Sequence, residues 1–527
     1  MPLLRTHSRW LQKLPLVGPR VVPRPFFMDL NTPILRLSNK GDVLSLGMSF
    51  EAIFATGQTG GGKSSGPAAY LARALLNTGA GMLVLAAKPG EADLWRRYCA
   101  ECGRIDDLVV FDGRPDGHRF NFLDYEFRRG GVGSGEAMNI TELLMRIAEA
   151  TQRYRKGASS SDPFWPTEGR KLTSHTVDAL TSAHGRINVS DIVRFIQDAP
   201  TKENSLDDTA WREKSFCYQT ITKMLCDPAR PLSQHDRQVV ADFFGKDFRM
   251  LADRTRSGIT AEVNGMLTPL LKGTPHTLFS TVSTLCPEAC LEGAILVIDM
   301  PVKVWNEVGV LAATIFKALF QRMAERRDVR LNPRPLALFM DECQFFISDA
   351  DNEFQSTARS SRVATVALTQ NLPTIMEHIG GRHPEHAAKQ WLGNFATKIM
   401  CANGCEVTNN WASQLIGRGR VQMQGSSEGI GTTRSRNHSI QYGGSYSERG
   451  GPTSSSGSGR GSSSGHSFNR SRSVSETMDQ LVQSGDFGRL LRTGGPANGR
   501  CVDTVIYRAG HQFRSTGTNW MLCTFRQ

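Results

Sequence analysis

The sequence of 527 residues lacks any long apolar run. No uninterrupted stretch approaches the roughly 18–20 apolar residues that a helix needs to cross a bilayer. Residues 1–29 are basic and rich in proline, and they lack the apolar centre of a signal peptide. We therefore expect a cytoplasmic chain without a transmembrane segment of its own, so that any place at the inner membrane would be peripheral and held through a partner.

Cysteine and histidine give no sign of a disulfide framework or a metal centre. The eleven cysteines are odd in number, and the expected compartment is reducing. Cys99 and Cys102 form a single C-x-x-C pair, whereas a zinc ion needs four ligands, or three and a water. The histidines have no ligand spacing. We interpret these cysteines as core or incidental residues.

The overall composition is that of a globular protein with a basic surplus. Hydrophobic residues make up 39% and charged residues 21%, which excludes global disorder. The net charge is +12 and the sequence pI about 9.3. A surplus of this size favours an anionic partner such as nucleic acid or an acidic membrane surface. A basic soluble protein without such a partner is an equal alternative.

Short apolar stretches alternate with helical stretches, which indicates a parallel sheet covered on both faces. The expected strands lie at 50–55, 82–87, 108–111, 294–298, 336–340, 364–368, 502–508 and 520–525. A helix is expected over 63–76, and another carries apolar residues at helical spacing between 308 and 320. The sequence therefore predicts an α/β fold.

This α/β pattern is interrupted, which divides the chain into four parts. Residues 1–40 are a basic, proline-rich arm, and 41–130 are the first part of the α/β domain. Over 131–290 the strand pattern disappears and apolar residues recur at helical spacing, so we expect an all-helical inserted domain. Residues 291–527 complete the α/β domain.

A segment rich in glycine and serine lies within the last part, at about 424–470. From Arg418 to Arg472 the chain holds eight arginines against two glutamates. Such a composition buries too little apolar surface to offset the entropy of ordering, so we expect a disordered loop. The loop could bind nucleic acid through phosphates, with Tyr442, Tyr446 and Phe468 stacking on bases, or serve as a solvated linker.

A phosphate-binding motif, G-x-x-x-x-G-K-[ST], falls between the first expected strand and helix. Its residues are Gly57, Gln58, Thr59, Gly60, Gly61, Gly62, Lys63 and Ser64, and we extend the binding segment to Ser65. Glycines allow backbone N–H groups to surround phosphate oxygens, and the helix N-terminus adds a positive dipole. Lys63 would contact the β- and γ-phosphates of ATP and Ser64 would ligate Mg²⁺.

Two adjacent carboxylates follow the apolar strand at 336–340. Because ligands bind at the carboxyl ends of parallel strands, Asp341 and Glu342 are expected beside the phosphates. Asp341 would support the Mg²⁺ ion, and Glu342 would orient or deprotonate the attacking water. These roles favour ATP hydrolysis to ADP and phosphate, while a P-loop kinase stays possible.

Further residues near the strand at 364–368 complete the candidate site. Gln370 follows that strand and would sense the γ-phosphate or the water. Arg359 and Arg362 precede it in a basic stretch, where either could be an arginine finger for a neighbouring subunit or a solvated side chain.

The combination resembles the cytosolic part of conjugative type IV secretion coupling proteins of the TraG/TraD type, within the FtsK/HerA class of RecA-like motor ATPases. The resemblance extends from about residue 42 to 527. Its more specific motifs are Lys88-Pro89-Gly90-Glu91, Asn121-Phe122-Leu123, Pro163-Phe164-Trp165, Thr369-Gln370-Asn371-Leu372, 394–399 and 413–417.

That resemblance implies a RecA-like P-loop NTPase interrupted by an all-helical inserted domain, assembled as a homo-hexamer. It implies an ATP-driven motor that couples DNA, or a DNA–protein complex, to a membrane-bound transfer machine. Arg359 is the better positional match to the arginine finger of the family and Arg362 the second. An ATPase receptor for protein cargo and a nucleotide-gated scaffold with little turnover are the alternatives.

Overall fold

The computed structural model describes residues 25–156, 167–201, 208–348, 350–379, 383–447 and 450–527. Residues 1–24 of the predicted arm and the Pro163-Phe164-Trp165 motif lie outside these ranges. One compact unit comprises the described residues up to Asn409 together with Gly485–Gln527, and a second comprises Asn410–Ser484. The two units are described separately.

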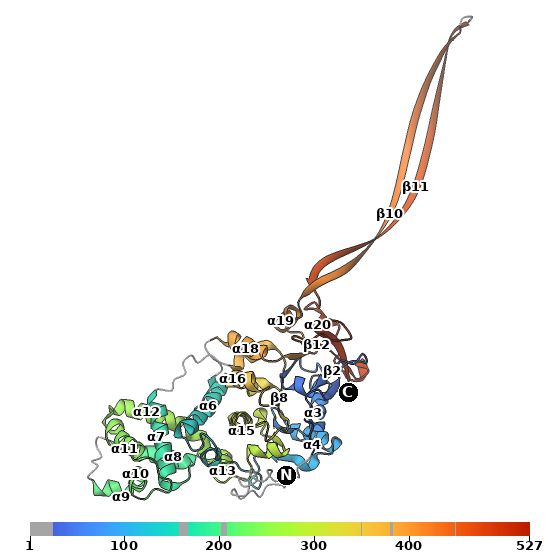
Figure 1. Ribbon diagram of the computed structural model, residues 1–527. Helices are drawn as coiled ribbons and strands as arrows, with labels where there is room; N and C mark the ends of the chain where they lie inside the picture. Colours follow the sequence, from blue (N-terminus) through green and yellow to red (C-terminus); the bar gives the residue numbers. More distant parts are fainter. Residues whose placement is uncertain (1–24, 157–166, 202–207, 349, 380–382, 448–449) are drawn as a thin grey trace. The chain divides into compact units, whose positions relative to one another are not determined.

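A nine-stranded sheet organises the first unit, in the order β13-β12-β9-β3-β8-β7-β4-β6-β5. The seven strands from β9 to β5 are parallel to one another, whereas β12 and β13 are antiparallel at one edge. The strand bounds are β3 Ile53–Thr56, β4 Gly81–Leu85, β5 Leu108–Phe111, β6 Ile295–Ile298, β7 Leu336–Met340, β8 Val363–Thr369, β9 Thr397–Met400, β12 Cys501–Arg508 and β13 Trp520–Arg526. The predicted α/β fold with a mainly parallel sheet is confirmed (Figure 1).

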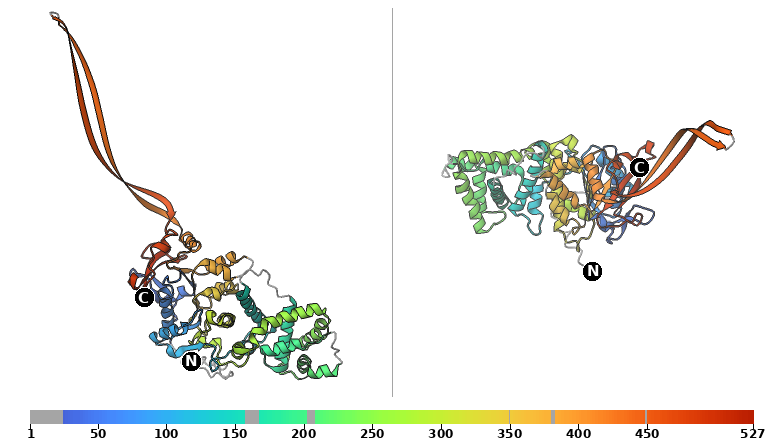
Figure 2. Two further views of the ribbon diagram at one scale, coloured as in Figure 1. Left: turned by 180° about the vertical axis from the view of Figure 1, so that it is seen from behind. Right: turned by 90° about the horizontal axis from the view of Figure 1, so that it is seen from above.

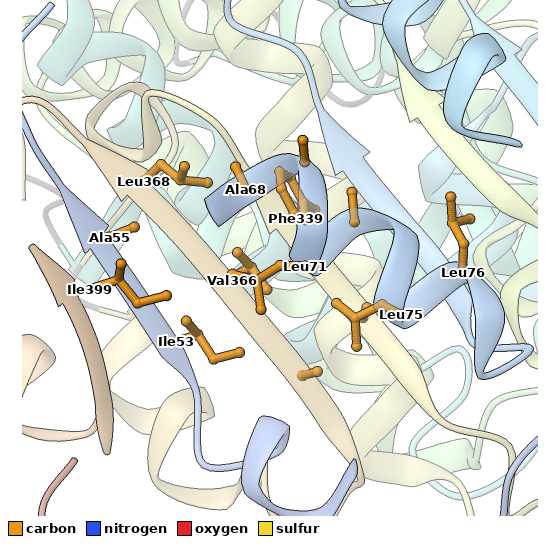
Figure 3. Packing of buried hydrophobic residues seen from close by; sticks show 14 of the residues in the cluster. Ile53, Ala55, Ala68, Leu71, Leu75, Leu76, Phe339, Val366, Leu368 and Ile399 are labelled. Atoms are coloured by element: carbon orange, nitrogen blue, oxygen red, sulfur yellow. The ribbon is translucent and has the colours of Figure 1, made fainter. Parts of the chain in front are cut away.

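Helices cover both faces of this sheet, and its central strands are therefore buried throughout. The helix α3 (Pro67–Asn77) buries Ala68, Leu71, Ala72, Leu75 and Leu76, which recur at helical spacing on one face. Figure 3 shows Leu71 and Leu75 of this helix beside Val366 of β8. The other helices around the sheet are α4 Glu91–Glu101, α14 Val302–Trp305, α15 Glu307–Arg326, α16 Ala350–Thr357, α17 Leu372–Ile379, α18 Pro384–Gly393 and α20 Asp486–Arg489, and α19 Glu406–Ile416 leads into the second unit.

Between β5 and β6 the described residues form helices and turns without a strand. These helices are α5 Phe122–Arg128, α6 Ala137–Lys156, α7 Thr167–His184, α8 Val189–Gln197, α9 Thr209–Lys214, α10 Phe216–Cys226, α11 Gln234–Asp242, α12 Asp253–Leu267 and α13 Gly273–Phe279. The helix α7 packs against α8, α10, α11 and α12, and Figure 2 shows these helices grouped together. The helical segment therefore interrupts the sheet at the place where the strand pattern disappears from the sequence.

Four details differ from the sequence predictions. The strand β9 was not predicted, because two of its four residues, Thr397 and Lys398, are polar and interrupt the apolar pattern. The helix expected over 63–76 begins only at Pro67, because proline lacks the N–H that would donate to the carbonyl of Lys63. The predicted arm of residues 1–40 includes a strand, β1 (Pro33–Arg36), which pairs with β2 (Val43–Ser45); these two strands flank a turn. This β1–β2 pair is followed directly by a four-residue helix, α2 (Leu46–Ser49), which precedes β3.

The fourth difference is in the second unit, where the expected disordered loop is a β-hairpin. Strands β10 (Arg418–Ser447) and β11 (Gly450–Gln480) pair antiparallel along their length, which corrects both the state and the bounds of the predicted 424–470 loop (Figure 1). Composition predicted disorder because it measures apolar burial, whereas a ribbon satisfies its backbone hydrogen bonds across the pair without a core.

None of the helices in the described ranges combines the length and the hydropathy needed to span a membrane.

Candidate nucleotide-binding site

The candidate site lies where three neighbouring strands end. The phosphate-binding loop follows β3, Asp341 follows β7, and Gln370 follows β8, which separates the other two. Parallel strands direct all three segments to the same edge of the sheet. They surround a cavity of about 320 Å³, whose lining residues are Gln58 to Ser65, Lys88, Lys303, Glu342 and Gln370.

The loop geometry requires glycine at two of the motif positions. Gly62 has a φ of +83°, and a β-carbon there would meet Val502 and the Thr493 carbonyl. At Gly57 a β-carbon would lie 2.7 Å from that of Cys401, which follows β9. The loop is thus packed against Val502 of β12, the Thr493 carbonyl and Cys401 after β9, which explains why side chains are excluded at both positions.

Lys63 lies over its own loop. Its Nζ donates to the carbonyls of Gly57 at 2.5 Å and Gln58 at 3.1 Å, and the residue is 7% exposed. Burial lowers the pKa of Lys63, and the charges of Glu342 and Asp341 oppose that shift. An ammonium group in this position is close to any phosphate that enters the cavity.

Ser64 and Asp341 come together from different strands. The Ser64 hydroxyl donates to Asp341 Oδ2 at 2.9 Å. A hydroxyl and a carboxylate at this separation are the hard oxygen ligands that Mg²⁺ prefers, and Mg²⁺ usually completes its shell with water and phosphate oxygens. The two residues therefore fit the ion that the sequence predicts.

Glu342 is held in an unusual conformation. Its φ of 52° is left-handed, a state that costs energy for a residue other than glycine and is concentrated at functional sites. The residue is 2% exposed. Its carboxylate accepts hydrogen bonds from Gln344 Nε2 at 2.8 Å and from Gln370 Nε2 at 3.2 and 3.4 Å. The general base of the sequence analysis thus stands between two amide donors.

Lys88 completes the surroundings of Glu342. Its Nζ lies 2.5 Å from Glu342 Oε1 and 3.9 Å from Asp341 Oδ2. Burial would raise the pKa of Glu342, but the hydrogen bonds from Lys88, Gln344 and Gln370 and the charge of Lys88 hold it below its usual value. The carboxylate is therefore kept ionised.

The same turn brings a further carboxyl group to the site. Glu91 is 8% exposed, and its Oε1 has no hydrogen-bond partner within the described ranges. Burial, with the charge of Asp341 in support, raises the pKa of Glu91 to about 8. Sequence reasoning assigned Lys88 and Glu91 no role, although both stand in the Lys-Pro-Gly-Glu motif after β4.

Gln370 is positioned through its backbone. Its carbonyl accepts hydrogen bonds from Thr56 Oγ1 at 3.2 Å and from Asn403 Nδ2 at 3.0 Å. Asn403 follows the unpredicted strand β9, so the sequence offered no sign that it supports the site. With its backbone held in this way, Gln370 directs its amide at Glu342.

Arg359 and Arg362 do not join this cluster in the same chain. Both precede β8, whereas the site follows it, so they lie at the opposite end of that strand. Arg359 is 75% exposed by its side chain and pairs only loosely with Glu51, at 3.4 Å. Arg362 donates to the Pro333 carbonyl and is half-buried. Of the two, Arg359 is the side chain available to a neighbouring molecule.

Other features add no second site of this kind. Within the described part of the chain, no group of three or more His, Cys, Asp or Glu side chains could hold a metal ion. A larger cavity of about 630 Å³ lies between α3 and α4, but of the predicted site residues only Ser65 lines it. The smaller cavity is thus the candidate site because of the chemistry of the residues that line it, and not because of its volume.

Fold and site together define a RecA-like P-loop NTPase fold. Residues 335–491 match the family model described as the TraM recognition site of TraD and TraG. No curated protein matches the sequence.

Solved structures of the plasmid coupling protein TrwB are similar over most of their length. The unbound monoclinic form of the bacterial conjugative coupling protein TrwBdeltaN70 has a TM-score of 0.52 at 13% identity, covering 90% of this chain and 86% of that one. The TrwB complex with ADP and Mg²⁺ has a TM-score of 0.56 at 12% identity, covering 95% and 89%. The complex with the ATP analogue ADPNP has a TM-score of 0.54 at 13% identity, covering 93% and 88%. The predicted resemblance to coupling proteins of the TraG/TraD type is confirmed.

Proposed function

We propose that this chain is a Mg²⁺-dependent ATPase. The observation that carries the proposal is the hydrogen bond between Ser64 and Asp341, which joins the phosphate-binding loop to the acidic strand end beside Glu342. In this proposal Lys63 and the loop amides bind the phosphates, while Ser64 and Asp341 hold Mg²⁺. The ion neutralises charge on the phosphates when bound. Solved structures of TrwB in complex with ADP and Mg²⁺ and with ADPNP support this assignment.

The remaining site residues would act on the attacking water. Glu342, kept ionised by its donors, accepts a proton from the water, and Gln370 orients the water or senses the γ-phosphate. Arg359 cannot serve the site of its own chain from the far end of β8. We therefore place it in the site of the adjacent subunit, where it would stabilise the charge that develops on the γ-phosphate.

We propose further that the subunits form a homo-hexameric ring that moves DNA, or a DNA–protein complex, toward a transfer machine. The fold shared with a conjugative coupling protein, the exposed Arg359 and the basic surplus support this assembly and cargo. Hydrolysis between subunits would alter their contacts and shift the segments that hold the cargo.

Protein cargo is the second candidate. The family model that matches residues 335–491 is described as a recognition site for TraM in TraD and TraG, and that description specifies recognition rather than transport of DNA. A chain with such a site could receive a nucleoprotein or protein partner.

The test is the rate of ATP hydrolysis by the purified chain, with and without single- and double-stranded DNA. Glu342→Gln serves as the blank, and ATP binding is measured in parallel. We expect DNA to stimulate turnover by the unchanged chain. The Glu342→Gln variant should lose turnover and still bind ATP. Turnover that ignores DNA would favour protein cargo, and ATP binding without turnover under any condition would contradict the ATPase proposal and favour a nucleotide-gated scaffold.

A further inference from the structure

The hairpin of β10 and β11 has two chemically different faces. Its register pairs Ile430 with Phe468, Arg436 with Ser462 and Tyr442 with Ser456. From Arg418–Gln480 to Ser445–Thr453, every pair joins two even-numbered or two odd-numbered positions. Directly opposed residues share a face, and successive residues alternate between faces. Even-numbered residues of both strands therefore form one face of the ribbon, and odd-numbered residues form the other.

All the arginines of the hairpin whose side chains are described fall on the even face. They are Arg418, Arg420, Arg434, Arg436 and Arg460. The same face carries His438 and His466, and its exposed large side chains are Ile430, Ile440, Tyr442, Phe468 and Met478. Over 430–442 and 454–468 this face has no acidic residue.

The odd face over the same ranges is small, neutral and polar. It consists of Gly431, Thr433, Ser435, Asn437, Ser439, Gln441, Ser455, Gly457, Gly459, Gly461, Ser463, Gly465 and Ser467. The hydroxyls of Ser435 and Ser463 lie 2.9 Å apart on this face.

The stability of the hairpin itself does not explain why its arginines gather on one face. An isolated two-stranded ribbon is marginally stable in water, and like charges on neighbouring positions of one face repel. Arg434 and Arg436 are two residues apart, and Arg460 lies diagonally across from Arg436, which faces Ser462, so the ribbon gathers its cations instead of distributing them. A partner that supplies negative charge at regular intervals would convert this repulsion into attraction.

We propose that the even face of the hairpin binds duplex DNA, with the ribbon in the major groove. That groove is about 12 Å wide and admits a two-stranded β-ribbon. The face between Ile430 and Tyr442 extends for about 40 Å at 3.4 Å per residue, which is close to one turn of B-DNA. Arginine guanidinium groups match phosphates and guanine edges, and the small odd face leaves the ribbon thin.

Other anionic partners fit the face less well. Single strands are usually held by aromatic side chains on which bases stack, whereas Tyr442 and Phe468 lie near opposite ends of this stretch. Duplex RNA has a major groove too narrow for a ribbon. A membrane surface favours a continuous apolar stripe, but serine occupies most of the even positions of β11 over 454–468. The proposal is independent of the nucleotide site.

The test compares the full chain with two hairpin variants, without ATP, by titrating a labelled 24-base-pair DNA duplex at several salt concentrations. In the first variant Arg434, Arg436 and Arg460 are changed to Gln. Each phosphate contact adds about 0.9 to the slope of log affinity against log salt, so we expect this slope to fall by about 3. The ratio of the two affinities would then change roughly 40-fold between 50 and 200 mM salt.

The second variant exchanges two neighbours, Arg436→Asn with Asn437→Arg, and preserves composition and charge. If one face binds, this exchange moves one cation away from the DNA and lowers the slope by about 1. An unchanged slope would mean that the arginines act without a fixed face, and it would overturn the ribbon geometry.

A cross-strand lock guards against a hairpin that fails to form. In Ser435→Cys with Ser463→Cys, oxidation would fix the register on the odd face, and we expect DNA affinity to be kept or raised. Loss of binding on oxidation would overturn the proposal. Equal or tighter binding of a duplex RNA of the same sequence, of single-stranded DNA, or of phosphatidylserine vesicles would overturn the choice of partner.

Discussion

The ammonium of Lys88 lies 2.5 Å from Glu342 Oε1, so a lysine from the turn after β4 neutralises the carboxylate that follows β7. The two strands are neighbours in the sheet, and their parallel register brings the two turns together. Glu342 needs a negative charge to accept a proton, and Lys88 is the charged group that keeps its pKa low against the effect of burial. Lys88 is thus a positioning residue for the proposed base.

Lys88→Met should shift the pH dependence of ATP turnover. With this donor and charge removed, the pKa of Glu342 rises, and turnover, which falls as pH drops through that pKa, should be lost at a higher pH than in the unchanged chain. The measurement is the pH profile of the hydrolysis rate at saturating ATP. Lys303→Met, which removes another lysine from the lining of the cavity, is the matched control. It should leave unchanged the pH at which turnover is lost on the acidic side of the profile.

Glu342→Gln should separate binding from hydrolysis. The amide keeps the size of the side chain but cannot accept the proton of the water, so we expect turnover to fall at least 100-fold. ATP affinity should change by less than about threefold, because the Glu342 side chain contacts Lys88, Gln344 and Gln370, which lie outside the phosphate-binding loop. Titration with a fluorescent ATP analogue and a steady-state assay measure the two quantities, and turnover that survives the change would remove Glu342 from its assigned role.

Lys63→Ala should weaken ATP binding and abolish turnover. The lysine is buried against its own loop and lines the cavity where the phosphates are expected. We expect ATP affinity to fall by a factor of ten or more, as for loss of a charge-assisted hydrogen bond of about 1.5–3 kcal/mol. Circular dichroism should confirm that the fold is intact. Near-normal binding would show that the loop does not hold phosphate.

Ser64→Ala and Asp341→Asn should each raise the Mg²⁺ concentration that turnover requires, and the two effects should not add. Both side chains are proposed to hold one ion, so the double variant should be about as impaired as the worse single variant. The measurement is the Mg²⁺ concentration that gives half-maximal turnover. Strictly additive effects would mean that the two residues act on separate steps.

Arg359→Ala should act across subunits. A mixture of Arg359→Ala chains, which have an intact loop, with Lys63→Ala chains, which have an intact Arg359, should hydrolyse ATP faster than either preparation alone. Arg362→Ala is the comparison, since that side chain contacts the Pro333 carbonyl of its own chain. If mixing restores nothing, Arg359 does not serve the site of a neighbouring subunit.

Lys317→Met should lower the free energy of unfolding by about 3–5 kcal/mol, since it leaves Asp351 buried without its ionic partner. Lys317 joins α15 to the segment that follows Glu342, where it also donates to the Phe346 carbonyl. Urea denaturation measures the loss. Pairing the change with Asp351→Leu should recover part of the stability, because both buried charges are then gone.

Local pattern was enough for the strands that carry the site. Five consecutive apolar residues mark β7, and the prediction of 336–340 agrees with Leu336–Met340. The phosphate-binding motif is equally local, because its glycines and its lysine must be adjacent in the chain to form one loop. The chemical identity of Lys63, Ser64, Asp341 and Glu342 followed from these short stretches.

Contacts between distant segments were decided only by the tertiary structure. Lys88 and Asn403 support the site because β4 lies beside β7 and β9 beside β3, an order that the chain sequence does not contain. The two faces of the hairpin likewise depend on which residue of β10 opposes which residue of β11, and a shift by one position would mix its arginines with its glycines. Sequence alone fixed which chemical groups are available, whereas strand order and register decided which of them meet, because side chains hundreds of residues apart interact only when the backbone hydrogen bonds of the sheet bring them together.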